Sequence, residues 1–290
     1  INDVEYTTAV QADGSWSVGI TAAQVSAWPA GAVNIAVSGE SSAGNPISIT
    51  HPVTVDLTPA AITINTIATD DVINAAEKGA NLTLSGTTTN VEAGQTVTVT
   101  FGGKNYTASV AGDGSWTATV PAADLAALPE GSASAQASVS NINGNSASAV
   151  HSYSVDSSAP TIIINTVASD NIVNASEADA GVTVSGSTTA EAGQIVTVTL
   201  NSPTVQTYQA TVQADGSWSI NIPAADLAAL TDGSHTLTAT VNDKAGNPAS
   251  TTHNLAVDLT VPVLTINTIA GDDIINATEH GQALVISGSS

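Results

Sequence analysis

Apolar and polar side chains alternate along several short stretches of this chain. In residues 95–102, Val97, Val99 and Phe101 are separated by threonines, and Trp116 begins a similar stretch. Because successive side chains of a strand point to opposite faces of a sheet, this period of two predicts strands with one buried face. Seven short strands of this kind favour an all-β fold of antiparallel sandwiches. We predict them near residues 62–68, 82–86, 95–101, 105–110, 115–120, 132–139 and 147–155.

One short segment departs from this alternation. Residues 121–128 read Pro-Ala-Ala-Asp-Leu-Ala-Ala-Leu, in which proline favours the start of a helix and alanine and leucine favour its continuation. We therefore predict a single helical turn between two strands.

The whole pattern repeats along the chain. Trp16, Trp116 and Trp218 each end the sequence Asp-Gly-Ser-Trp, and they lie 100 and then 102 residues apart. Two series of aspartates keep the same step, Asp56, Asp156 and Asp258 in linkers and Asp70, Asp170 and Asp272 in loops. A fixed step of this kind is typical of tandem repeats. We predict a partial module at residues 1–57, whole modules at 58–157 and 158–259, and a partial module at 260–290.

The odd number of strands leads to an expectation about architecture. An antiparallel chain that crosses a module seven times enters at one end and leaves at the other, so successive modules should stack end to end as a rod. Neither partial module closes a sandwich alone, so we expect frayed ends and a longer parent protein.

Charge narrows the possible functions. The chain has 25 acidic residues, three lysines and no arginine, for a formal net charge of −22. Nucleic-acid binding is excluded because phosphate contacts need a basic surface, and binding to anionic membranes is disfavoured for the same reason. With no cysteine, the chain has neither disulfides nor thiolate metal sites. A polyanion of this kind repels itself, and calcium is the natural counterion.

Strand order suggests where calcium ligands gather. The acidic first loop and the linker aspartate lie at the exit end of a module, and the loops at Glu191 and at 243–247 lie at the entry end of the next. Carboxylate and amide oxygens of this kind suit calcium. The predicted calcium ligands are Asp56, Asp70, Asp71, Asn74, Glu77, Glu92, Asp156, Asp170, Asn174, Glu177, Glu191, Asp243, Asn247, Asp258, Asp272, Asp273 and Glu279.

Some of these carboxylates have simpler explanations. The aspartates of the Asp-Gly-Ser-Trp sequences, Asp13, Asp113 and Asp215, are read as turn residues. The linker aspartates have an alternative role as caps of the last strand. Residues 141–145 offer asparagines where the next module has Asp243, so the best calcium site is expected between modules 58–157 and 158–259.

Enzyme activity is not expected. His51, His151 and His253 each lie five residues before a linker aspartate, and a repeated strand position of this kind is usually structural. No nucleophile motif, phosphate-binding glycine loop or metalloprotease helix is present. Trp28 replaces a leucine of the other copies, and it is either a larger core residue or part of a glycan- or receptor-binding patch. A carbohydrate-active enzyme with accessory sandwiches would need a catalytic domain outside this chain.

Longer motifs indicate a family. The segments VDLTPAAITINTIATDDVINAAE, VDSSAPTIIINTVASDNIVNASE and VDLTVPVLTINTIAGDDIINATE, together with DGSW and PAADLAAL, resemble the bacterial Ig-like tandem repeats of giant adhesins. The resemblance covers nearly the whole chain. It implies an extracellular or cell-surface fibre, exported by type I secretion, that attaches to host cells or biofilm matrix through other parts of the protein.

The same resemblance implies calcium at module junctions. The family's ligands would map onto Asp56, Asp156 and Asp258 and onto the neighbouring acidic loops. Two positions depart from that pattern, because Asn171 stands for Asp71 and Asn143 is read as the counterpart of Asp243.

Overall fold

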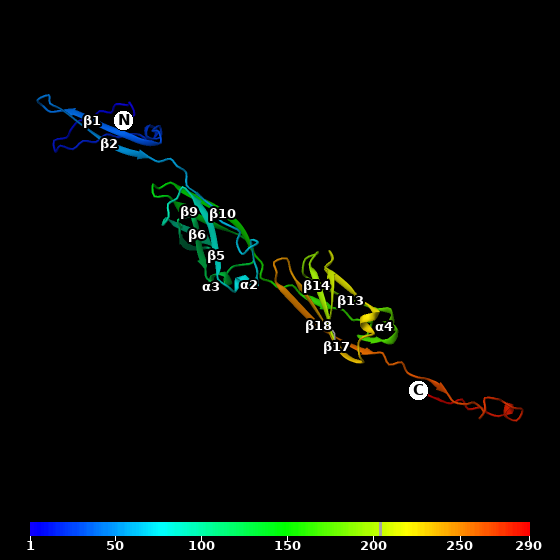
Figure 1. Ribbon diagram of the computed structural model, residues 1–290. Helices are drawn as coiled ribbons and strands as arrows, with labels where there is room; N and C mark the ends of the chain where they lie inside the picture. Colours follow the sequence, from blue (N-terminus) through cyan, green and yellow to red (C-terminus); the bar gives the residue numbers. More distant parts are fainter. Residues whose placement is uncertain (203–204) are drawn as a thin grey trace. The chain divides into compact units, whose positions relative to one another are not determined.

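The computed structural model describes residues 1–202 and 205–290. The chain divides into two compact units, which are described separately (Figure 1). Unit 1 comprises Ile1–Val72 and Gly79–Val155, and unit 2 comprises Ile73–Lys78 and Asp156–Ser290. Among the described residues, no helix is long and apolar enough to cross a membrane.

Unit 1 contains a sandwich of two sheets. In the described residues, one sheet has the order β3-β5-β8 and the other the order β4-β10-β9-β6-β7. A separate hairpin pairs β1 with β2. The elements are α1 (Ala22–Val25), β1 (Gly31–Glu40), β2 (Pro46–Val55), β3 (Ala61–Ile62), β4 (Val72–Ile73, ending in unit 2), β5 (Leu82–Thr89), β6 (Thr96–Phe101), β7 (Lys104–Ser109), β8 (Ser115–Val120), α3 (Ala122–Ala126), β9 (Gly131–Ser140) and β10 (Ser146–Val155).

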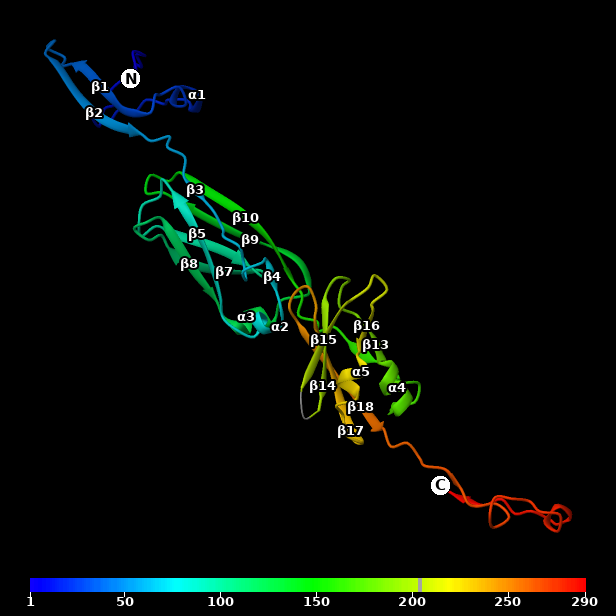
Figure 2. The same cartoon turned by 45° about the vertical axis from the view of Figure 1, so that its right-hand side comes forward.

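Unit 2 repeats this arrangement (Figure 2). In the described residues its sheets have the orders β11-β13-β16 and β12-β18-β17-β14-β15, and β19 pairs with β20. The elements are α2 (Ala75–Lys78), β11 (Ile162–Ile164), β12 (Ile172–Asn174), α4 (Ala175–Ala180), β13 (Val182–Thr188), β14 (Ile195–Asn201), β15 (Gln206–Thr211), β16 (Ser217–Ile222), α5 (Ala224–Leu227), β17 (Gly233–Asn242), β18 (Pro248–Asp258), β19 (Thr265–Ile266), η1 (Glu279–Gly281) and β20 (Gly288–Ser289).

The predicted all-β sandwich fold is confirmed. Six of the strands predicted from alternation correspond to β5 through β10, and the predicted helical turn corresponds to α3. The prediction for residues 62–68 was too long, because regular strand geometry there is confined to β3. The segment still pairs with β5, since the N–H groups of Thr63 and Asn65 donate to Thr87 and Ser85.

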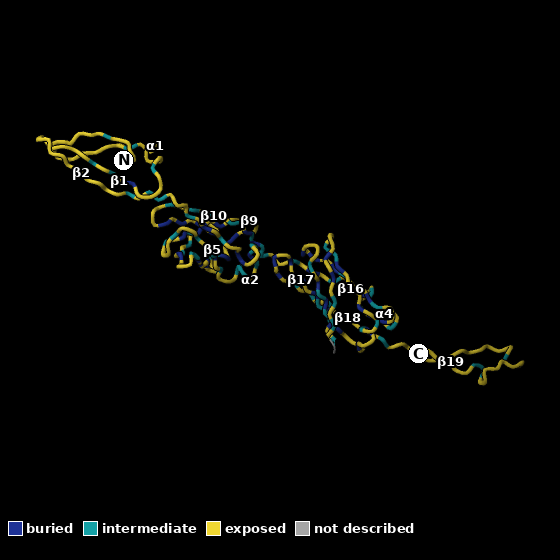
Figure 3. Tube along the Cα trace, turned by 45° about the horizontal axis from the view of Figure 1, so that its top comes forward, coloured by how far each residue is buried: buried dark blue, intermediate teal, exposed yellow. Residues whose placement is uncertain are grey.

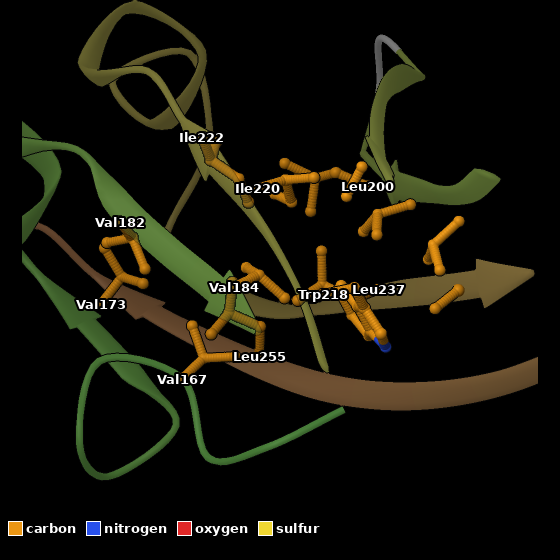
Figure 4. Packing of buried hydrophobic residues seen from close by; sticks show 14 of the residues in the cluster. Val167, Val173, Val182, Val184, Leu200, Trp218, Ile220, Ile222, Leu237 and Leu255 are labelled. Carbon is orange, nitrogen blue, oxygen red and sulfur yellow. The ribbon is translucent and has the colours of Figure 1, made fainter. Parts of the chain in front are cut away.

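The alternating apolar residues form the cores. In unit 2, Val184, Trp218, Leu237 and Leu255 pack together between the two sheets (Figure 4). Unit 1 has Trp116 in the place of Trp218, and its core also holds a stacked ring pair, Phe101 and Tyr153, with centroids 4.6 Å apart.

Nearly all buried residues lie in the sandwiches (Figure 3). Within residues 1–57, all of which the structure describes, Val33 alone is buried, and no residue of 260–290 is buried. Trp16, the counterpart of the core tryptophans, is therefore half exposed, at 49%. Trp28 is partly buried beside the end of α1.

We predict that Gly86→Ala destabilises unit 1 by about 3 kcal/mol, because overpacking of a close-packed core is costly. A methyl group at Gly86 would overlap the carbonyl oxygen of Thr63 and lie 2.7 Å from Cζ2 of Trp116. Urea unfolding, monitored by hydrogen exchange of β5 and β8, measures the effect. Gly112→Ala is the control, because its methyl group would meet no atom within 4 Å. Equal stability of the two variants would contradict this account of the core.

Candidate functional site

The first acidic loop has the same local structure in both units. In unit 1, Asp70 accepts the N–H of Val72 at 3.0 Å, and Asp71 accepts the N–H of Ile67 at 2.8 Å. In unit 2, Asp170 and Asn171 accept the corresponding N–H groups. The backbone of Asp71 and Asn171 has positive φ, which aspartate and asparagine tolerate better than most residues. These side chains therefore shape the loop.

The asparagine and glutamate that end each loop cap a short helix. At α4, Asn174 accepts the N–H of Glu177 at 3.1 Å, and the Glu177 carboxylate accepts the N–H of Asn174 at 3.0 Å. Asn74 and Glu77 form the same reciprocal pair at α2. This is a capping box, which satisfies two N–H groups that a helix start leaves without partners.

The strand histidines contact these loops. His151 Nε2 lies 2.7 Å from Asp71 Oδ1, and His253 Nε2 lies 2.7 Å from Asn171 Oδ1. The hydrogen bonds that Ile67 and His151 make to Asp71 lower the pKa of its carboxyl group. The contacts fit the structural role predicted for the histidines.

In unit 2, a turn lies at residues 243–247, and its residues Asp243, Ala245 and Asn247 are buried. The side chain of Asp243 is held by Asn247, whose backbone N–H and Nδ2 donate to the carboxylate at 2.7 and 2.9 Å. Asn247 Nδ2 also donates to the backbone oxygen of Asp156 at 2.8 Å, and Asn247 Oδ1 accepts the N–H of Ala75 at 2.8 Å. Asp243 is 7% exposed and Asn247 is 1% exposed. The structure thus brings together three predicted site residues, Asp156, Asp243 and Asn247.

The equivalent turn of unit 1 corrects one prediction. Asn145 donates its backbone N–H to Asn141 Oδ1, as Asn247 does to Asp243. The counterpart of Asp243 is therefore Asn141, and the prediction that it is Asn143 was wrong. Asn143 instead donates its amide to the Asp56 carboxylate at 2.6 Å, and Asn145 donates to the Asp56 backbone oxygen at 3.2 Å.

The other predicted ligands also accept backbone N–H groups. Glu92 accepts from Ile142 and Glu191 from Lys244, so each braces one of the two turns. In the last part of the chain, N–H acceptors of the same kind are Asp258, Asp272, Asp273 and Glu279. The Asp-Gly-Ser-Trp aspartates Asp13, Asp113 and Asp215 accept from the following serines, which confirms their role in turns.

The predicted ligands have oxygen atoms of the kinds that calcium binds, but in the described part of the chain their side chains do not cluster as in a typical metal site. All the predicted ligands are carboxylates or amides, and calcium prefers oxygen. Within residues 1–202 and 205–290, however, no three acidic or histidine side chains form a group that could hold a metal ion.

Two features of the site were not predicted from the sequence. One is the N–H of Ala75 as a partner of Asn247, which no side-chain motif reveals. The other is Lys78, whose Nζ lies 3.3 Å from Ser157 Oγ, next in sequence to Asp156. The asparagine–glutamate spacing of the capping boxes, by contrast, was readable in the sequence.

We predict that Asp71→Asn weakens the acid sensitivity of unit 1. Because the folded-state pKa of Asp71 is lowered from 3.8, its contribution to stability is present above that value and is lost as pH falls through the folded pKa. The measurement is urea unfolding in a chelator from about pH 5 to about pH 2. The reciprocal variant Asn171→Asp should add such a dependence to unit 2. Identical pH curves for the wild type and Asp71→Asn would refute the prediction.

Comparison with known proteins identifies relatives. The family described as bacterial Ig-like domain matches residues 159–259. A Ca2+-stabilized adhesin with which an Antarctic bacterium binds ice is 34% identical, over 97% of this chain and 70% of its own, with a TM-score of 0.49. A 1.5-MDa bacterial ice-binding adhesin is 33% identical, over 90% of this chain and 85% of its own, with a TM-score of 0.48.

A single bacterial Ig-like domain from the M. primoryensis ice-binding adhesin is 36% identical, over 34% of this chain and 99% of its own, with a TM-score of 0.28. No curated protein matches the chain. Because identity above 30% extends over nearly the whole chain and over more than two thirds of a relative, the chain belongs to the family of bacterial Ig-like domains that are repeated in large adhesins.

Proposed function

We propose that this chain is a stalk segment of a bacterial cell-surface or secreted adhesin, and that calcium bound at the junctions between its Ig-like modules makes the stalk stiff. Membership of the adhesin repeat family supports the first part. The second part is supported by a relative that is described as a Ca2+-stabilized adhesin.

The observation that carries the calcium proposal is the burial of Asp243 beside a backbone oxygen. The Asp243 carboxylate and the Asp156 carbonyl oxygen accept hydrogen bonds from the same nitrogen, Asn247 Nδ2. The two oxygens are therefore close neighbours. Burial of a carboxylate costs free energy unless a cation or several hydrogen-bond donors compensate its charge. Calcium can coordinate carboxylate, carbonyl and water oxygens at the same time.

We assign Asp156 and Asp243 as the principal protein ligands of this site. Calcium completes its six to eight ligands with backbone oxygens and water, so a site of this kind does not require three carboxylates. Asn74 and Glu77 already form a capping box, and we treat them as secondary candidates.

The equivalent position of unit 1 should bind calcium more weakly. Asn141, which is neutral, takes the place of Asp243. The Asp56 carboxylate already accepts the amide of Asn143, and unit 2 has an alanine, Ala245, at the corresponding position. In unit 2, therefore, no asparagine amide at position 245 competes with calcium for the Asp156 carboxylate.

Calcium would act through thermodynamic linkage. An ion present at ten times its dissociation constant favours the bound arrangement by about 1.4 kcal/mol per site. Extracellular modules bind calcium with dissociation constants on the order of 10⁻⁴ to 10⁻³ M, so the sites would fill outside the cell and be empty in the cytosol. The stalk would then become stiff after export.

We predict that calorimetric titration detects calcium binding that Asp243→Asn abolishes or weakens at least tenfold. The matched variant Asn141→Asp should strengthen binding at the equivalent turn of unit 1. Small-angle scattering at about 2 mM calcium and in excess chelator tests whether calcium stiffens the stalk. The maximum dimension should decrease on chelation. If neither calorimetry nor scattering responds to calcium, the chain is a spacer that works without the ion.

A further inference from the structure

We propose that Asn247 is a positioning residue that holds the segment Ile73–Lys78 in unit 2 through a hydrogen-bonded amide clamp that needs no metal ion. The inference goes beyond the proposed function, because it concerns a second restraint that acts whether or not calcium binds.

The clamp consists of three contacts made by one buried amide. Asn247 Oδ1 accepts the N–H of Ala75 at 2.8 Å, while Nδ2 donates to the Asp156 oxygen at 2.8 Å and to the Asp243 carboxylate at 2.9 Å. The side chain is 1% exposed, so water does not compete for these groups. A hydrogen bond in such surroundings is stronger than one at the surface.

The N–H of Ala75 is a group that needs an outside partner. Ala75 is the first residue of α2, and the N–H groups of a first helical turn have no acceptor within the helix. The capping box satisfies the N–H groups of Asn74 and Glu77 and leaves that of Ala75 to Asn247. The clamp thus completes the capping of α2 from a residue 172 positions away in sequence.

The chemistry at position 247 requires an amide. Nδ2 of Asn247 donates to two oxygens, one of them on a carboxylate, and Oδ1 accepts from an N–H. Aspartate has the same size but has no donor, and its charge would oppose that of Asp243. Glutamine offers the same groups on a stem that is one methylene longer, so both its oxygen and its nitrogen would be displaced from these partners.

Neighbouring hydrogen bonds bring the same segment to the linker. The N–H of Asp156 donates to the Ile73 oxygen at 3.0 Å, and Lys78 Nζ lies 3.3 Å from Ser157 Oγ. In unit 1, Asn145 Nδ2 makes one of the clamp's donor contacts, to the Asp56 backbone oxygen at 3.2 Å. Asn145 is therefore a matched position for a control.

The test is amide hydrogen exchange at Ala75, measured by NMR in calcium and in excess chelator. We expect the Ala75 N–H of the wild-type chain to be protected in both conditions. Asn247→Ala should lower the protection about tenfold in both, and Asn247→Asp should do the same, whereas Asn145→Ala should leave it unchanged. Amides of β17 and β18 report whether unit 2 remains folded in each variant.

A second measurement uses the wild-type chain and is independent of how the variants fold. A scalar coupling across the hydrogen bond, between the Ala75 nitrogen and the side-chain carbonyl carbon of Asn247, should be detectable in chelator. Unchanged Ala75 exchange in folded Asn247→Ala, or loss of the wild-type coupling and protection on chelation, would overturn the proposal. Absence of calcium binding in calorimetry would overturn the calcium part of the proposed function and leave the clamp intact.

Discussion

Each sandwich depends on one indole in a core built mainly from aliphatic side chains. Trp116 and Trp218 pair in register with Gly86 and Gly186, and each glycine leaves the space that the ring and a neighbouring carbonyl occupy. Among the described residues, neither indole N–H has a hydrogen-bond partner. An unpaired polar group costs about 1 to 3 kcal/mol, whereas burial of a tryptophan contributes about 5 kcal/mol. Packing therefore outweighs the unsatisfied N–H, and the glycine is what makes that packing possible.

Local patterns predicted the longer strands, because alternation along a strand depends on that strand alone. They did not predict β4 and β12, which have two and three residues and form through tertiary pairing. In β12, Ile172 pairs in parallel with Ala256, more than eighty residues away. No pattern within so few residues reveals such a partner. The strand predicted at 62–68 was too long, because β3 ends at Ile62 and the residues beyond it pair with β5 through the N–H groups of Thr63 and Asn65. The backbone then turns away at Ala68 and Thr69, where φ is positive.

Residue types indicated the chemistry of the site but not the partner of each group. Acidic loops rich in asparagine were read as metal ligands, yet Asp70, Asp71 and Glu177 accept backbone N–H groups at turns and at a helix start. Both uses draw on the same carboxylate oxygens, so composition cannot separate them. The equivalence of Asn141 with Asp243 became visible through the hydrogen bonds of the turn, because three asparagines within five residues leave the alignment ambiguous.

The three copies of this turn show that its hydrogen bond does not depend on the charge of the accepting residue. Asn45, Asn145 and Asn247 each donate a backbone N–H to the first residue of the turn, which is Ser41, Asn141 and Asp243 in the three copies. A hydroxyl, an amide and a carboxylate thus perform the same backbone task. The negative charge of Asp243 is not required by the turn, and in a chain of net charge −22 a buried carboxylate adds an electrostatic cost. A divalent cation that binds beside Asp243 would offset that cost, which gives the charge a role that the fold does not.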